Sequence, residues 1–220
     1  MKGLVVLRAI LPDTKWLDKL RAYAPDVVCF SVTTGVHTHA VEVNRRIKVE
    51  MPKVLSIFGG PHPTFTPEMI EEPGIDAICR GEGEAAIVEL LDRMQRGEDY
   101  YSTENFWFKH RKTGEIVKNP VRPIAQDMDA LGFPDREVIY ESAAVYRDSD
   151  RKVFVSQRGC PMPCSFCFHH AWKKKVYTVK NSEYVRKRSV THLLEEIKQV
   201  KAKYNLKFVH FVDDIFNLRN

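Results

Sequence analysis

The chain has 220 residues, of which 44% are hydrophobic and 29% are charged, and its formal net charge is +5. This composition is typical of a soluble globular protein with one large domain or two small ones. No apolar run reaches the roughly 20 residues that span a bilayer, and the first stretch, MKGLVVLRAILPDTKW, has no small-residue cleavage site. An odd number of cysteines without a regular framework argues against a secreted disulfide protein, so we expect a cytoplasmic one.

Strand-like and helix-like segments alternate along residues 1–100, which we predict to be the first domain. Continuous β-branched or apolar runs predict strands, and apolar residues at helical spacing predict helices between them. Pro12-Asp13-Thr14 is typical of a helix start, Pro25 ends the first helix and Gly97 closes the last one. The predicted strands are 4–10, 26–34, 53–60 and a short one at the start of 75–84, which runs into a Gly/Glu turn. The predicted helices are 16–24, 37–50 and 86–94. This order predicts an α/β fold with a doubly wound parallel sheet and helices on both faces.

Residues 101–150 interrupt this alternation. NFWFKH (105–110) and IVKN (116–119) flank a turn around Gly114, and this pattern predicts a β-hairpin. A connector with several prolines and no periodicity follows, and we place the domain boundary in it.

Residues 151–220 restart the alternation as a second domain. A strand at 152–157, a helix from Val190 to Tyr204 and a strand at 206–212 predict one βαβ unit, with Ser189 or Thr191 as the helix cap. One such unit cannot close a barrel or bury a two-faced sheet, so we expect this domain to be incomplete.

The loop RGCPMPCSFCFHH (158–170), called the cysteine loop below, joins the first of these strands to the helix. Its thiols have the spacing Cys160-x3-Cys164-x2-Cys167, which allows them to converge on one metal centre with little loss of loop entropy. Three interpretations are open at this point. A disulfide is disfavoured by the expected compartment, a zinc site would take His169 or His170 as its fourth ligand, and an iron–sulfur cluster usually takes four thiolates.

Two further observations favour a cluster with one open coordination position. We expect Cys29 and Cys79 to be small buried residues of the first domain, which leaves three local thiols for four irons. The pair Asp213-Asp214 follows the second strand of the βαβ unit, as the cysteine loop follows the first. Because a right-handed crossover puts both strand ends on one rim, the acids should face the open iron.

The motif RGCPMPCSFCF, with the aromatic Phe166 before the last cysteine, resembles the cluster motif of radical S-adenosylmethionine (radical SAM) enzymes. The resemblance implies a partial (β/α) barrel in which S-adenosylmethionine chelates the open iron of a 4Fe–4S cluster. One electron from an external flavodoxin or ferredoxin then releases a 5′-deoxyadenosyl radical. The resemblance also implies that S-adenosylmethionine contacts Phe166 and one acid of the pair, either Asp213 or Asp214. The implied cluster ligands are Cys160, Cys164 and Cys167.

The first domain is similar to the cobalamin-binding domain that precedes the barrel in one subgroup of this family. The similar stretches are PDVVCFSVTT, GGPHPTFTPE, IDAICRGEGE, GFPDRE (132–137) and VRKRS (185–189). The resemblance implies a flavodoxin-like sheet and cobalamin as a second cofactor at the carboxyl ends of its strands, where such sheets bind ligands. The implied cobalamin contacts are Ser31, Thr33, Thr34, Gly59, Gly60, Gly81 and Glu82.

Two features depart from the cobalamin-binding pattern. The D-x-H-x-x-G loop that supplies an axial histidine in many such folds is absent, and His62 lies in a different loop, so it is not assigned as a ligand. A strand and helix normally precede the one at 4–10, so we expect a fragment truncated at both ends and inactive alone.

The expected function is therefore radical methyl transfer or cyclisation of a small-molecule substrate, with no nucleic acid and no membrane span. One alternative is a zinc-stabilised nucleic-acid-binding protein, because residues 171–190 carry seven Lys or Arg against one acid, Glu183. Another is an electron carrier, which would require a fourth cysteine.

Overall fold

The structure is a computed structural model that describes residues 15–216. These residues form two compact units, 15–122 and 123–216, each of which is described by itself. The strand predicted at 4–10 and the helix start at Pro12–Thr14 lie outside the described residues. No helix within the described range is long and apolar enough to cross a membrane.

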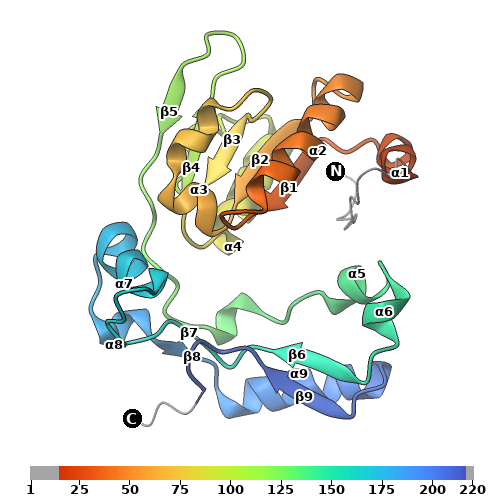
Figure 1. Ribbon diagram of the computed structural model, residues 1–220, viewed down its shortest axis with the longest axis vertical. Helices are drawn as coiled ribbons and strands as arrows, with labels where there is room; N and C mark the ends of the chain where they lie inside the picture. The colour runs from red at the N-terminus through yellow and green to blue at the C-terminus, as the bar shows by residue number, and fades with distance from the viewer. Residues whose placement is uncertain (1–14, 217–220) are drawn as a thin grey trace. The chain divides into compact units, whose positions relative to one another are not determined.

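The first unit alternates strands and helices up to α4 and then ends in a hairpin (Figure 1). The helices predicted around Trp16, at 37–50 and before Gly97 are confirmed, and Gly97 ends α4 in the left-handed conformation with φ of 69°. The elements are α1 (Lys15–Tyr23), β1 (Val27–Ser31), α2 (His37–Glu50), β2 (Leu55–Gly59), α3 (Pro61–Phe65), the 3₁₀ segment η1 (Pro67–Glu71), β3 (Ala77–Cys79), α4 (Glu84–Arg96), β4 (Phe106–Lys109) and β5 (Ile116–Lys118).

The described strands of this unit form one mixed sheet in the order β1-β2-β3-β4-β5. Strands β1, β2 and β3 are parallel, which confirms the predicted flavodoxin-like class. The hairpin β4–β5 adds to this sheet through antiparallel pairing of β3 with β4. In the sequence analysis we grouped this hairpin with the connector in residues 101–150. In the structure, its residues Phe106 and Phe108 are buried in the core of the first unit.

Helices cover both faces of this sheet, as the continuous apolar strands predict. Phe58 and Ile78 point to the face covered by α2 and η1, whereas Ile57 and Ala77 point to the face covered by α4. All four residues are at most 3% exposed, and each large side chain buried in this way contributes roughly 1.5–3 kcal/mol. Cys79 is buried and its pKa is raised by burial to about 12. Cys29 is exposed on β1, so the prediction that it is buried is wrong.

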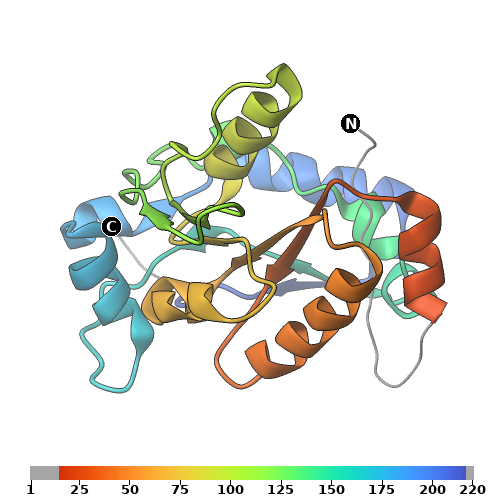
Figure 2. The ribbon, with the colours of Figure 1, turned by 90° about the horizontal axis from the view of Figure 1, so that it is seen from above.

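The second unit begins with a segment of short helices and continues into a βαβ unit (Figure 2). The predicted connector contains α5, which Asp135 caps by accepting hydrogen bonds from the backbone of Glu137 and Val138. The elements are η2 (Asp129–Leu131), α5 (Arg136–Tyr140), α6 (Ala144–Arg147), β6 (Arg151–Phe154), β7 (Gln157–Arg158), α7 (Phe168–Ala171), the π-helical η3 (Trp172–Tyr177), α8 (Asn181–Tyr184), β8 (Arg186–Lys187), α9 (Val190–Lys203) and β9 (Phe208–Phe211).

Strands β6 and β9 pair in parallel and α9 connects them, so the predicted βαβ unit is confirmed. Ser189 caps α9, because its hydroxyl accepts a hydrogen bond from the backbone N–H of His192. Phe154 and Val200 form the core between the strands and α9. The short strands β7 and β8, which the sequence did not predict, pair antiparallel on either side of the cysteine loop.

A buried carboxylate joins α9 to the rest of the second unit. Glu196 is 2% exposed, and its two oxygens accept hydrogen bonds from Arg136 at 2.5 Å and from Arg188 at 2.5 Å. Both arginine side chains are largely buried as well. Removing the carboxylate would leave two buried cations without their partner, which is far more costly than losing an exposed ion pair.

We therefore predict that Glu196→Ala lowers the free energy of unfolding by about 3–5 kcal/mol. Urea unfolding followed by far-UV circular dichroism measures the change. Glu195 is exposed on the same helix and is the matched control, with an expected effect within about 0.5 kcal/mol for Glu195→Ala. Equal effects of the two substitutions would contradict the role given to the Glu196 carboxylate.

Candidate functional site

The cysteine loop leaves β7 through a tightly packed glycine. Gly159 has a φ of +89°, and a Cβ at this position would collide with the backbone carbonyl of Tyr184. Further along the loop, the backbone N–H of Cys167 donates to the carbonyl of Cys164 at 3.2 Å. This bond closes a turn that contains the last two cysteines of the motif.

The donor set of the cysteine loop fits a thiolate-ligated centre. All three thiols are free; Cys164 is exposed and Cys160 and Cys167 are half-buried. Within residues 15–216, no three or more His, Cys, Asp or Glu side chains are already gathered around a common metal position. Phe166 is 92% exposed, so core packing does not explain an aromatic residue at this point of the loop.

Asp213 lies at the carboxyl end of β9 and bonds to the end of β6. Its Oδ1 atom accepts hydrogen bonds from the backbone N–H groups of Ser156 at 2.7 Å and Gln157 at 3.2 Å. Its Oδ2 atom accepts a bond from the Ser156 hydroxyl at 2.5 Å. The structure thus brings the acidic pair and the start of the cysteine loop to one edge, as the strand order predicts.

Asp214 faces the other end of the cysteine loop. Its Oδ1 atom lies 2.8 Å from Nε2 of His169, and Nδ1 of the same ring lies 2.8 Å from the hydroxyl of Tyr184. Both ring nitrogens of His169 therefore lie beside groups other than thiols. This leaves His170 as the histidine for the alternative zinc site.

The basic segment 171–190 is not a uniform solvated face. Lys173 is buried against the side chain of Asn181, and Arg186 is buried with a bond to the carbonyl of Ala125 at 2.9 Å. Arg188 is held by Glu196. Three of the seven cations therefore serve internal contacts, which weakens the argument for nucleic-acid binding by this segment.

The predicted cobalamin contacts lie at the last residues of β1 and β2 and in the segments directly after β1, β2 and β3. They are called the rim of the first unit below. Two hydrogen bonds join these segments to one another, and a third, between Thr64 and Gly60, lies within the segment after β2. The backbone N–H of Val32 donates to Gly59 at 2.9 Å, the Thr64 hydroxyl donates to the carbonyl of Gly60 at 2.8 Å, and the backbone N–H of Gly81 donates to the Thr64 hydroxyl at 3.1 Å. The rim residues, all at the carboxyl ends of parallel strands, are Ser31, Thr33, Thr34, Gly59, Gly60, Gly81 and Glu82.

Close packing within the rim accounts for one of its two paired glycines. Gly60 has a φ of +93°, and a Cβ there would lie 2.8 Å from the carbonyl oxygen of Val32. At Gly59 a Cβ would meet only ordinary contacts, the nearest at 3.7 Å. Gly60 is therefore required by the fold, whereas packing does not require a glycine at position 59.

Two histidines that the sequence analysis did not single out as a pair lie beside the rim. His62 is buried and stacks on His37 with ring centroids 3.8 Å apart, and its Nδ1 lies 3.0 Å from the hydroxyl of Thr34. Burial and the neighbouring His37 lower the pKa of His62. Since the two histidines are 25 positions apart, at the start of α2 and within α3, no local pattern predicts their contact.

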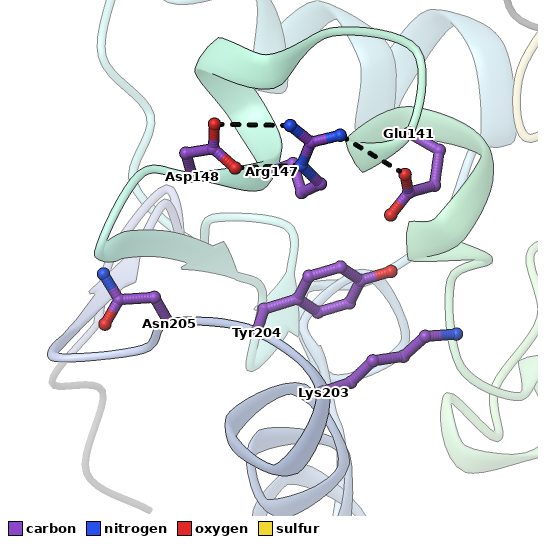
Figure 3. A pocket seen from close by; sticks show the side chains of 6 residues that line it. All are labelled: Glu141, Arg147, Asp148, Lys203, Tyr204 and Asn205. Carbon is purple, nitrogen blue, oxygen red and sulfur yellow. Dashed lines mark hydrogen bonds and ion pairs between the residues drawn. The ribbon is translucent and has the colours of Figure 1, made fainter.

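A cavity of about 450 Å³ lies elsewhere in the second unit (Figure 3). Asp148 and Asn205 in its lining directly precede β6 and β9, so it lies at the amino ends of these strands and away from the cysteine loop. Arg147 in its wall is paired with Asp148 at 2.9 Å and with Glu141 at 3.8 Å. Lys203, the other cation of its lining, lies 2.6 Å from Glu137, so both cations are paired with carboxylates of the protein itself.

Comparisons with known proteins agree with the geometry of both units. The protein-family model described as "B12 binding domain" matches residues 5–91. The chain is 31% identical over 201 residues to a Pyrococcus horikoshii protein named "Uncharacterized methyltransferase PH0819", with 90% of this chain and 42% of that protein covered. It is 27% identical over 214 residues to the anaerobic magnesium-protoporphyrin IX monomethyl ester cyclase of Rubrivivax gelatinosus, with 93% of this chain and 36% of that protein covered.

A solved structure shares the fold along nearly the whole chain. It is the cobalamin-dependent S-adenosylmethionine radical enzyme OxsB, with aqua-cobalamin and S-adenosylmethionine bound. The TM-score is 0.69 at 20% identity, and the match covers 91% of this chain and 27% of OxsB. Together with the family-model match and the two curated relatives, this confirms the resemblance to radical SAM enzymes that carry a cobalamin-binding domain. The chain spans less than half the length of the two curated relatives named above.

The packing of Gly60 generates a prediction with an internal control. Gly60→Ala adds a backbone clash to the strain of a positive φ, whereas Gly35→Ala adds only the strain, because Gly35 has a φ of +101° and open space around it. We expect the Gly60 variant to lose about 1–3 kcal/mol more stability than the Gly35 variant. Urea unfolding of both variants measures the difference, and equal losses would contradict the packing role of Gly60.

Proposed function

We propose that this chain is the cofactor-binding part of a cobalamin-dependent radical SAM enzyme that catalyses methyl transfer to, or cyclisation of, a small-molecule substrate. The observation that supports this most directly is in the second unit. The CxxxCxxC loop and the pair Asp213-Asp214 meet at one end of two parallel strands, through bonds from Ser156 to Asp213. Active sites of α/β barrels lie at this end of the strands.

In this proposal the thiolates of Cys160, Cys164 and Cys167 hold a 4Fe–4S cluster. Three protein ligands leave one iron for the amino and carboxylate groups of S-adenosylmethionine. An acid of the Asp213-Asp214 pair accepts from the ammonium of that ligand, a charge-assisted bond that is stronger than a neutral one. The exposed ring of Phe166 lies within the motif and supplies an apolar contact to the same ligand.

The rim of the first unit binds cobalamin in this proposal. The hydroxyls of Ser31 and Thr33 supply hydrogen-bonding groups, and Gly59 allows close backbone approach, because a side chain is absent there. The family match over residues 5–91 includes all three residues. When bound, the cluster supplies one electron to S-adenosylmethionine and cobalamin carries a methyl group. The electron donor is an external flavodoxin or ferredoxin.

The cluster assignment is tested by anaerobic reconstitution of the chain with iron and sulfide. We expect about four iron atoms per chain and broad visible absorbance, both lost in the alanine variants of Cys160, Cys164 and Cys167. Cys29→Ala is the matched control, because Cys29 is an exposed cysteine outside the loop and its removal should leave the iron content unchanged. A colourless chain that holds one stoichiometric zinc would support the nucleic-acid-binding alternative and contradict the proposal.

Cobalamin binding is tested separately by gel filtration of the chain with hydroxocobalamin. We expect the corrinoid absorbance to elute with the wild-type protein and to be lost for Ser31→Trp, which places a large ring on the rim. Val49→Trp is the control, since Val49 is 81% exposed on α2 and outside the rim. Equal retention by both variants would remove the rim from the proposed cobalamin site.

A further inference from the structure

We infer that the two acids after β9 have different roles: Asp213 is a positioning residue that holds the start of the cysteine loop, and Asp214 is the carboxylate available to the ammonium of S-adenosylmethionine. This division rests on the proposed function, which names both acids as candidates for one role. It is derived from the contacts that each carboxylate makes.

Asp213 is already engaged by the protein. A carboxylate offers about four acceptor sites, and three of those of Asp213 are taken by Ser156 and Gln157. Two of the three donors are backbone N–H groups, which would have to find other acceptors if the carboxylate turned towards a ligand. A single free site is a poor receptor for an ammonium group, which has three N–H donors.

The far side of this contact shows what Asp213 positions. The carbonyl of Ser156 accepts from the backbone N–H of Arg188 at 2.9 Å, and the carbonyl of Val155 accepts from the Arg188 guanidinium at 3.0 Å. Arg188 is held in turn by the buried Glu196. A continuous series of polar contacts therefore runs from Glu196 to Asp213 and fixes Val155 and Ser156. Cys160 follows Ser156 by four residues.

Asp214 has the opposite character. Its side chain is 37% exposed, and its Oδ1 atom lies beside Nε2 of His169, a largely buried ring in the helix that follows Cys167. This contact involves the Oδ1 atom of the carboxylate. Asp214 thus presents a partly exposed carboxylate next to the end of the cysteine loop.

The experiment compares Asp213→Asn with Asp214→Asn in the reconstituted chain. Each variant is measured first for iron content and for the electron paramagnetic resonance (EPR) spectrum of the reduced cluster, without S-adenosylmethionine. S-adenosylmethionine is then titrated, and the change of the EPR spectrum gives its apparent Kd. Far-UV circular dichroism and urea unfolding show whether each variant is folded under the conditions used.

We expect Asp213→Asn to lower the iron content or to change the EPR spectrum before any ligand is added, because the amide loses the negative charge and one of the two acceptor oxygens that hold the residues before Cys160. Ser156→Ala, which removes only the hydroxyl contact, should produce a smaller change of the same kind and keeps the test available if Asp213→Asn does not fold. Asp214→Asn should keep the wild-type iron content and spectrum but raise the apparent Kd by about tenfold or more, as expected for loss of one charged hydrogen bond.

The reverse pattern would overturn the inference: a normal cluster with weakened ligand binding in Asp213→Asn, and no effect in Asp214→Asn. Identical behaviour of the two variants would overturn it as well. A wild-type cluster whose EPR spectrum does not respond to S-adenosylmethionine would exclude the role given to Asp214. Failure of the wild-type chain to assemble any cluster would instead refute the proposed function, so the two failures are distinguishable.

Discussion

Parallel pairing of strands is the constraint on which the candidate residues of both units depend. Parallel strands end at the same edge of a sheet, so segments far apart in the chain meet there. In the second unit, the pairing of Arg151 with Phe208 through Phe154 with Phe211 brings Ser156 next to Asp213, although 57 residues separate them. In the first unit, the same arrangement joins the segments after β1, β2 and β3. Without parallel register, neither group of residues would exist as a site.

The edge in the second unit is held mainly by charged groups. Burying Glu196 between Arg136 and Arg188 requires all three to lose water, and a well-packed apolar core would stabilise the unit at least as well. What the charged contacts add is direction, because each guanidinium bond has a defined geometry. The cysteine loop itself has little regular structure between β7 and α7. Its position therefore depends on the contacts of the flanking residues more than on its own packing.

The helices and strands were predictable from the sequence because their signals are local. Helical spacing of apolar residues and the cap residues Ser189 and Gly97 gave α9 and α4 with nearly correct ends. The helix α5 was missed, although Asp135 after Pro134 is a recognisable cap signal. Contacts between distant residues were not predictable in this way. Two examples are the bond from Arg188 to Ser156, which in turn contacts Asp213, and the stacking of His37 on His62. Both contacts depend on the tertiary fold, and no spacing within the sequence predicts them.

Packing alone can account for a residue at a strand end that matches a ligand-binding motif, so such a match is not by itself evidence of a ligand. Gly60 looks like a cofactor-binding glycine, but the carbonyl of Val32 alone excludes a side chain there. Asp213 looks like a ligand-binding acid, but the backbone of the neighbouring strand already occupies most of its acceptor sites. Such residues would be retained even in a fold that bound nothing. Evidence for a ligand must come from the residues that packing leaves unexplained. These include the exposed ring of Phe166, the glycine at position 59, where a Cβ would meet only ordinary contacts, and the partly exposed carboxylate of Asp214.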